Sequence, residues 1–303
     1  MPVVYHSANV DMAFQSGPCL RIGTTTLPIL PPYRRYRSLS HRSVKIVMQR
    51  IKPFFRRSTP RIYRALSRAR AYGEFAFRSP EIIFTRFSQT NRWGSLNSHS
   101  GIGSDLEQTT ELRRMLPTFI AELQCRSVVD VPCGDYFWMS HIDLDVDRYI
   151  GADIVSALVD ANRAAFGDDS HSFMVLDLTR DELPPVDLIF CRDCLVHLSY
   201  ADAGCALRTI RSSRATYLLT TTYIARDRNY NIPTGSWRPI NLERPPFNFP
   251  PPLKLIDERC TEGNGQFTDK HLGLWRVADL PCDKSRRIGS FRNRGTAHRD
   301  QWQ

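Results

Sequence analysis

The run of residues 127–135 constrains the fold of this chain more than any other part of the sequence. It reads Ser-Val-Val-Asp-Val-Pro-Cys-Gly-Asp, so an apolar strand ends in Asp130 and is followed by a turn that contains Gly134. A second apolar segment ends in Asp153, 23 residues after Asp130. A glycine turn lets the backbone approach a ligand, and the second acid presents a carboxylate to ribose hydroxyls. The pattern predicts a nucleotide-binding βαβ unit.

The turn of this unit holds too little glycine for a dinucleotide. A pyrophosphate needs a second and a third glycine, and residues 133–136 supply only Gly134. Asp135 in the turn would repel an anion but accept a hydrogen bond from an ammonium group. These features favour S-adenosylmethionine, whose sulfonium and amino acid tail carry no phosphate.

Two later segments extend the pattern. Residues 173–178 have the form of a third strand that ends in Asp177, an acid able to receive an adenine amino group. Residues 186–198 have the form of a fourth strand and its exit. With these strand ends in order, the chain resembles class I S-adenosylmethionine-dependent methyltransferases, close to bacterial members with an Asp-x-Pro-Cys-Gly-Asp first motif. The resemblance covers about residues 93–280.

The resemblance implies an α/β fold, with a Rossmann-like, mostly parallel seven-stranded sheet and helices on both faces. It implies S-adenosyl-L-methionine as the cofactor. The alternative is an α/β protein that binds another nucleotide. The fold alone does not establish catalysis in either case. The residues it assigns to cofactor binding are Ser100, Gly101, Gly103, Asp130, Cys133, Gly134, Asp135, Asp153, Ile154, Asp177, Leu178 and Arg192.

The segment Ser100-Gly-Ile-Gly-Ser104 precedes the first strand. In methyltransferases of this kind such a segment often closes over the amino acid end of the cofactor. As a bare sequence it is a loop followed by a helix cap at Ser104. Both interpretations remain open.

Periodicity outside these motifs predicts alternating strands and helices with short connections, which favours a mostly parallel sheet. The expected helices span residues 104–124, 154–166 and 199–212, the last capped by Ser199. The expected later strands span residues 217–221, 253–256 and 272–277. Residues 179–185 are too few for a helix, so a loop is expected there.

A long insertion at residues 229–252 holds six prolines between positions 239 and 252, which exclude a helix. Loops at the carboxyl ends of parallel strands line the ligand crevice, so this insertion is the expected substrate wall. The candidate substrate-binding residues are Tyr223, Trp237, Arg238 and Asn241. Alternatively, the polar residues of this group tie the long loop to the domain.

The exit of the fourth strand supplies the candidate catalytic residues. His197 is a candidate general base, because an imidazole titrates near neutral pH, and Asp193 is a candidate to orient it or the acceptor. A structural role for His197 is the alternative. Enzymes that methylate exocyclic amines of DNA carry a Pro-Pro-aromatic motif here, and residues 191–195 read Cys-Arg-Asp-Cys-Leu instead.

The Pro-Cys pairs of the chain follow the first and last strands, which argues against a cysteine nucleophile for pyrimidine methylation. We therefore expect a small-molecule or glycan O-methyltransferase, although an amine acceptor is not excluded. The rival hypothesis is a non-catalytic Rossmann-like nucleotide-binding module that acts through a basic N-terminal arm.

That arm carries the charge asymmetry of the chain. Residues 1–90 hold 16 Lys and Arg and three acids, whereas the remainder holds 25 bases and 28 acids. Composition predicts disorder up to about Ser40 and a basic amphipathic helix at residues 44–52. This helix would contact an anionic membrane surface or pack on the domain. No motif indicates specific nucleic acid binding.

The expected organisation is a basic arm at residues 1–90, a methyltransferase domain at 91–282 and a basic disordered tail at 283–303. Met1 to Leu20 lack the pattern of a secretory signal, and no apolar stretch reaches the length of a membrane span. The eight cysteines show no framework spacing, and the pair Cys191 and Cys194 has no partner pair for zinc. We expect a cytoplasmic protein with reduced thiols and no metal.

Overall fold

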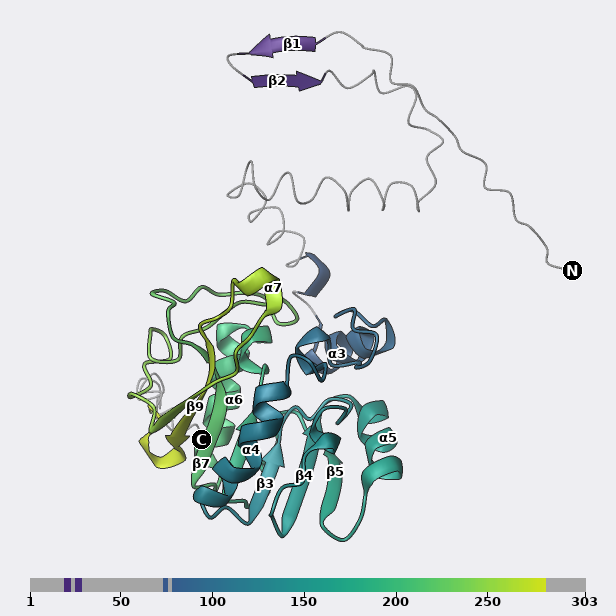
Figure 1. Ribbon diagram of the computed structural model, residues 1–303, viewed down its shortest axis with the longest axis vertical. Helices are drawn as coiled ribbons and strands as arrows, with labels where there is room; N and C mark the ends of the chain where they lie inside the picture. Colours follow the sequence, from purple (N-terminus) through teal and green to yellow (C-terminus); the bar gives the residue numbers. More distant parts are fainter. Residues whose placement is uncertain (1–18, 23–24, 29–72, 76–77, 282–303) are drawn as a thin grey trace, which may run out of the picture. The chain divides into compact units, whose positions relative to one another are not determined.

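A seven-stranded sheet is the larger of the two sheets in the computed structural model, which describes residues 19–22, 25–28, 73–75 and 78–281 (Figure 1). The strand order is β5-β4-β3-β6-β7-β9-β8. The strands span β3 Ser127–Asp130, β4 Arg148–Asp153, β5 His171–Val175, β6 Leu188–Cys191, β7 Tyr217–Tyr223, β8 Lys254–Asp257 and β9 Lys270–Arg276. Every strand expected from the sequence is present, with ends displaced by a few residues.

Strand direction in this sheet fixes where a ligand can sit. Strands β5, β4, β3, β6 and β7 are parallel neighbours, whereas β9 runs antiparallel to both β7 and β8. The chain starts the sheet at β3, adds β4 and β5 on one side, and then returns to place β6 on the other side. Such a switch point opens a crevice at the carboxyl ends of the strands.

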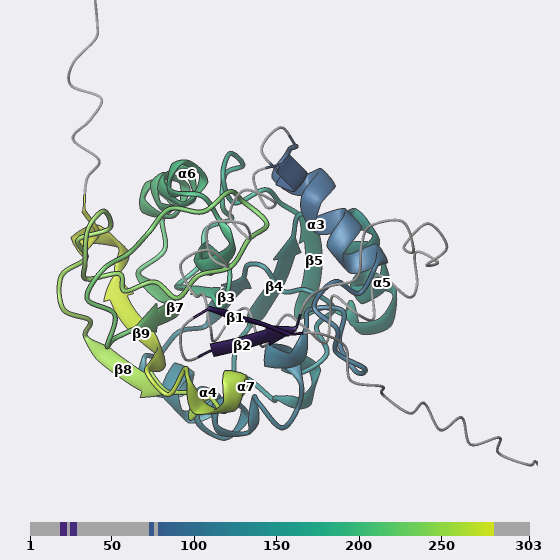
Figure 2. The ribbon, with the colours of Figure 1, turned by 90° about the horizontal axis from the view of Figure 1, so that it is seen from above.

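Helices cover both faces of the sheet. Helices α4 Thr110–Glu122 and α5 Ser156–Phe166 contribute to one apolar cluster, and α6 Tyr200–Ser212 contributes to the other. Seen from above, α4 and α6 lie on opposite sides of the strands (Figure 2). Successive residues of a strand point to opposite faces, so Val128 packs with α4 and Val129 packs with α6. The predicted fold class is confirmed.

Helix α3, Pro80–Gln89, lies inside the segment that the sequence assigned to the basic arm. Ser79 caps it through the amide of Ile82, and Pro80 occupies the first helical position. Ile83 and Phe87 are its buried residues, and the Phe87 ring lies 5.6 Å from that of Phe75. This helix carries side chains to the pocket described below.

Two expectations about local structure are wrong. Ser104 does not cap a helix: residues Ile102–Ser104 form a single 3₁₀ turn, Asp105 is extended, and α4 begins at Thr110. The region up to Ser40 is not wholly irregular either, because β1 Cys19–Ile22 and β2 Thr25–Pro28 form an antiparallel hairpin. Its strands contain β-branched Ile22, Thr25 and Thr26, which favour strands.

The expected cap of α6 and the expected loop before β6 are confirmed. Ser199 caps α6 through the amide of Asp202, and residues 179–185 form no helix. No helix of the described residues is long and apolar enough to cross a membrane. The expected basic helix at residues 44–52 and the tail at 283–303 lie outside the described residues.

Candidate functional site

A pocket lies at the switch point of the sheet, and four carboxylates from successive strand ends line it. Asp130 ends β3 and Asp153 ends β4, while Asp177 and Asp193 each follow a strand by two residues. Parallel strands bring their carboxyl ends to one edge of the sheet, which is why acids 63 positions apart in the sequence share one cavity.

The glycine turn after β3 is built against the second strand. The amide of Gly134 donates to Oδ2 of Asp153 over 3.0 Å, and the carbonyl of Gly134 accepts from the side chain of Asn162 on α5 over 2.8 Å. Gly134 has a φ of 57°, and a Cβ there would lie 1.9 Å from the Ser100 hydroxyl. Glycine is required both by the backbone conformation and by this close approach.

Asp135, predicted as a cofactor ligand, instead anchors the loop before α4. Its carboxylate accepts from the Ser98 hydroxyl at 3.0 Å, the Ser100 hydroxyl at 3.2 Å and the amide of His99 at 2.7 Å. Asp135 does not line the pocket, whereas Ser100 does. The carboxylate therefore acts by holding Ser100 at the pocket wall.

Asp130 and Asp153 are buried acids with raised pKa values. Burial raises the pKa of Asp130 to about 7, although Tyr149 opposes the shift by donating its hydroxyl over 2.6 Å. Burial also raises the pKa of Asp153 to about 6, against the amides of Val155 and Gly134 that donate to it. Within residues 78–281 neither acid forms an ion pair.

His197 reaches the pocket from the short 3₁₀ turn Leu195–His197. Its Nδ1 lies 2.9 Å from the carbonyl oxygen of Ser236, which can only accept, so Nδ1 carries the proton of the neutral ring. Burial lowers the pKa of His197, and the Ser236 carbonyl and Asp193 only partly offset this. The ring is neutral at pH 7 and its Nε2 has a free lone pair, as a general base requires.

Asp193 differs from His197 in its chemistry. Its Oδ2 accepts from Lys270 over 2.6 Å, and its amide donates to the Thr221 hydroxyl over 2.8 Å. Burial raises the pKa of Asp193, but the charges of Lys270 and Arg192 outweigh burial and bring the pKa to about 2. Asp193 is therefore a permanent anion at neutral pH, and it is the Ser236 carbonyl that orients His197.

Arg192 lines the pocket but is committed to a protein partner. Its Nε and Nη2 donate to Oε2 of Glu258 over 3.0 and 2.8 Å, and Nη2 also donates to the carbonyl of Gly103 over 3.0 Å. The guanidinium carbon lies 5.4 Å from the ring centre of Trp138. Arg192 thus ties the loop before α4 to the end of β8.

The predicted substrate wall does not line the pocket. Arg238 is wholly buried and donates to the carbonyl of Leu198, and Asn241 donates to the carbonyls of Ile224 and Arg226. The Trp237 ring packs 4.9 Å from that of Phe267 and 6.1 Å from that of Tyr223. These residues tie the insertion to the domain, which is the alternative that the sequence left open.

The predicted site residues fall into two groups, those that line the pocket and those that do not. Those that line the pocket are Ser100, Asp130, Cys133, Gly134, Asp153, Ile154, Asp177, Leu178, Arg192, Asp193 and His197. Those that do not are Gly101, Gly103, Asp135, Tyr223, Trp237, Arg238 and Asn241. Among the described residues no group of three or more His, Cys, Asp or Glu is placed to hold a metal ion.

Sequence reasoning missed one wall of the pocket. Pro80, Phe84 and Ser88 line it from α3, and Trp93 follows them. The Trp93 ring lies 6.4 Å from that of Phe84 and 5.8 Å from that of His197. Two features of the sequence could have predicted this helix face. Pro80, Phe84 and Ser88 are four positions apart, which places them on one side of a helix, and Ser79-Pro80 is a typical helix start.

No protein-family model matches this chain, and no curated protein matches it. The chain is similar to the methyltransferase domain of bacterial CtHen1, at 12% identity and a TM-score of 0.35, over 38% of this chain and 66% of that chain. It is similar to magnesium protoporphyrin IX methyltransferase from Synechocystis PCC 6803, solved with bound SAH, at 16% identity and a TM-score of 0.36, over 49% and 74% of the two chains. A third, an S-adenosylmethionine-dependent methyltransferase from Clostridium acetobutylicum ATCC 824, has 12% identity and a TM-score of 0.34, over 41% and 57%.

Proposed function

We propose that this protein is an S-adenosylmethionine-dependent methyltransferase that transfers the methyl group to a hydroxyl of a small-molecule or glycan acceptor. The observation that carries the proposal is the pair of buried strand-end carboxylates, Asp130 and Asp153, that line the pocket without a cationic partner in residues 78–281. Both carboxylates accept hydrogen bonds, but their pKa values stay raised, so these bonds offset only part of the cost of burying the charge. A ligand that brings hydroxyl donors and positive charge removes that cost.

The charge of the pocket selects among nucleotide-like ligands. Asp130, Asp153, Asp177 and Asp193 line it, and Arg192 is already paired with Glu258. A di- or triphosphate would meet these carboxylates without a free guanidinium to neutralise it. S-adenosylmethionine supplies a sulfonium, an ammonium and two ribose hydroxyls, which are the groups that carboxylates bind. The hydrogen-bond acceptors of this pocket therefore fit the cofactor.

The side chains around the cofactor position have separate tasks. Asp153 would accept the ribose hydroxyls, and Asp177 would accept the adenine amino group. The apolar rings of Phe84, Trp93 and Trp138 would exclude water, which strengthens the electrostatic interactions inside. When bound, S-adenosylmethionine supplies a methyl group already activated by its sulfonium.

Proton removal from the acceptor falls to His197. Its Nε2 takes the proton of the acceptor hydroxyl, while the Asp193 carboxylate accepts a hydrogen bond that orients the acceptor. A hydroxyl needs a base when it attacks, and a neutral amine does not lose its proton before attack. One open imidazole nitrogen therefore favours an oxygen acceptor over nitrogen.

The test is transfer of label from methyl-labelled S-adenosylmethionine to a panel of phenols, aliphatic alcohols and sugars, with amines as the comparison panel. We expect labelled methyl ethers, and a His197→Gln variant that binds the cofactor without forming them. Label that enters amines alone would overturn the hydroxyl acceptor. Cofactor binding without transfer to any panel member would favour the non-catalytic binding module, and no cofactor binding would overturn the proposal.

A further inference from the structure

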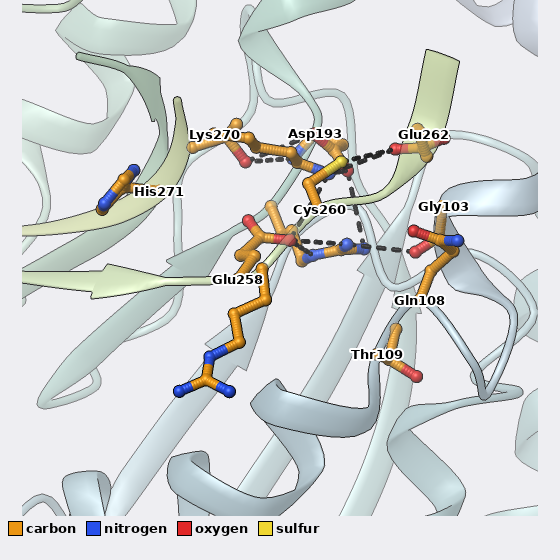
Figure 3. Close-up of polar contacts among 12 residues, drawn as sticks. Gly103, Gln108, Thr109, Asp193, Glu258, Cys260, Glu262, Lys270 and His271 are labelled. Carbon is orange, nitrogen blue, oxygen red and sulfur yellow. Dashed lines mark hydrogen bonds and ion pairs between the residues drawn. The ribbon is translucent and has the colours of Figure 1, made fainter. Parts of the chain in front are cut away.

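A buried ionic cluster lies beside the pocket, and Lys270 is at its centre. Lys270 on β9 is 1% exposed, and its Nζ lies 2.6 Å from Oδ2 of Asp193. The same nitrogen lies 3.4 Å from Oε2 of Glu258 and 3.7 Å from Oε2 of Glu262. Figure 3 shows Lys270 and Asp193 facing each other, with both glutamates near them. Lys270 itself does not line the pocket.

Burial of a lysine at this depth is expensive, so its placement calls for a physical reason. Moving an ammonium group out of water costs several kcal/mol of desolvation free energy, and close carboxylates are needed to offset that cost. Arg192 already supplies Glu258 with two hydrogen bonds. Glu258 therefore does not need Lys270 as its main partner, and the shortest contact of Lys270 is with Asp193.

Asp193 has an unusual backbone conformation for a residue that lines the pocket. Its φ is 53°, in the left-handed region that non-glycine residues rarely adopt. Two contacts hold it there, the Thr221 hydroxyl on its amide and Lys270 on its carboxylate. Four residues later the chain places His197 in the same pocket. One oxygen of Asp193 is thus committed to Lys270, and the side chain is still 27% exposed.

We propose that Lys270 is a positioning residue that fixes Asp193 as a charged hydrogen-bond acceptor for a second hydroxyl of the acceptor molecule, and thereby leaves the proton of the reacting hydroxyl to His197. This inference rests on the proposed function. Without Lys270 two groups at one site would compete for the same proton. With Lys270 the anion and the base are separate side chains, each with one task.

The charged groups near His197 determine the direction in which each substitution should move its pKa. Asp193 lies four positions before His197 in the chain, and the charges of Arg238 in the insertion and of Lys270 on β9 also act on its ring. Burial is the largest influence and lowers the pKa of His197, the Ser236 carbonyl and Asp193 raise it, and the two cations lower it. Removing the charge of Lys270 should therefore raise the pKa of His197, and removing the charge of Asp193 should lower it.

The experiment is an NMR titration of the full chain with histidine labelled at ring Cε1. The His197 signal, one of eight histidines, is assigned by its loss in His197→Gln. We expect the titration of His197 to move to higher pH in Lys270→Met and to stay at the wild-type position in Lys270→Arg. The matched control is Lys254→Met on β8, because Lys254 is half exposed and pairs with Glu122 over 3.1 Å.

Asp193→Asn is the second variant, and it keeps the test decisive if Lys270→Met does not fold. Lys270 retains Glu258 and Glu262 in that variant, and the His197 titration should move to lower pH. Opposite displacements in the two variants would support the inference, because a purely structural disturbance has no reason to follow the sign of the charge removed. An unmoved signal in either folded variant would overturn it. The titration uses no cofactor, so its failure is distinct from a failure to bind S-adenosylmethionine.

Discussion

Asp153 ends β4 and Asp193 follows β6 at the same edge of one sheet, but the pKa values of their two carboxyl groups are shifted in opposite directions. Asp153 is buried among backbone amides, and burial raises its pKa to about 6. Asp193 is partly buried, and Lys270 and Arg192 bring its pKa to about 2. The difference comes from buried cations that β9 and the exit of β6 supply, which the other side of the pocket lacks within residues 78–281.

This difference divides the pocket into two halves. We call the side of Asp130 and Asp153 the open-acid half, and the side of Asp193 and His197 the paired-acid half. The open-acid half leaves its charge to be balanced by a ligand. The paired-acid half brings its own cations, so its acid is preset as an anion and His197 remains the group that can change its protonation. A pair of titratable groups with separated pKa values is typical of acid–base chemistry.

The largest effect is expected in the paired-acid half. His197→Ala should lower the rate of methyl transfer by about 10²–10⁴-fold, the usual contribution of positioned proton transfer. Cofactor affinity should be retained, because the open-acid half is intact. The rate is measured with labelled cofactor and an acceptor from the screen. A variant with normal turnover would remove proton transfer from His197 and undo the division of tasks.

Next in size is the stability of the paired-acid half. Lys270→Met should lower the free energy of unfolding by about 3–5 kcal/mol, because it leaves buried carboxylates without their partner. The exposed pair of Lys254 with Glu122 is the control, and Lys254→Met should cost about 0–1 kcal/mol. Urea unfolding followed by circular dichroism measures both. Equal losses would mean that the buried cluster contributes no more than a surface pair.

A smaller effect is expected in the open-acid half. Asp153→Ala should weaken binding of S-adenosylmethionine by about 1–3 kcal/mol, because two ribose hydroxyls lose their acceptor. The matched comparison is Asp160→Ala, whose carboxylate pairs with Arg163 on the exposed side of α5 and lies outside the pocket. Calorimetric titration measures the affinity of each. Equal affinities of the Asp153 variant and the wild type would remove Asp153 from the cofactor site.

The smallest effect is a pH dependence of cofactor affinity. The pKa of Asp153 is raised to about 6 in the free protein, and only the ionised carboxylate accepts two hydroxyl hydrogen bonds. Ionisation of Asp153 should therefore strengthen binding as pH rises through about 6. Asp153→Asn should flatten that part of the profile. A wild-type affinity that is constant over this range would show that Asp153 does not titrate in contact with the ligand.

The sequence was most informative where local patterns repeat. Strand ends at Asp130 and Asp153 follow apolar runs with a fixed spacing, so the sheet and the open-acid half could be predicted. The cap at Ser199 needs only its neighbour Asp202, and it was also predicted correctly. Such features depend on contacts within a few residues.

Other parts of the site depend on contacts that no local pattern carries. Lys270 and Asp193 are 77 residues apart, and only the antiparallel pairing of β9 with β7 brings them together. An arginine such as Arg238 often binds ligands, but here its side chain is buried and donates to the carbonyl of Leu198, so it holds the insertion against the domain. Ser104 has the residue type of a cap, but the extended backbone of Asp105 ends the turn there.

The most direct test of the account is calorimetric titration of the wild-type protein with S-adenosylmethionine and, separately, with ATP, at a pH above the pKa of both Asp130 and Asp153. Both ligands carry adenosine, but one brings a sulfonium and an ammonium and the other brings a triphosphate. The account predicts that S-adenosylmethionine binds and that ATP does not, because the open-acid half needs positive charge. Binding of ATP in preference to S-adenosylmethionine would contradict it.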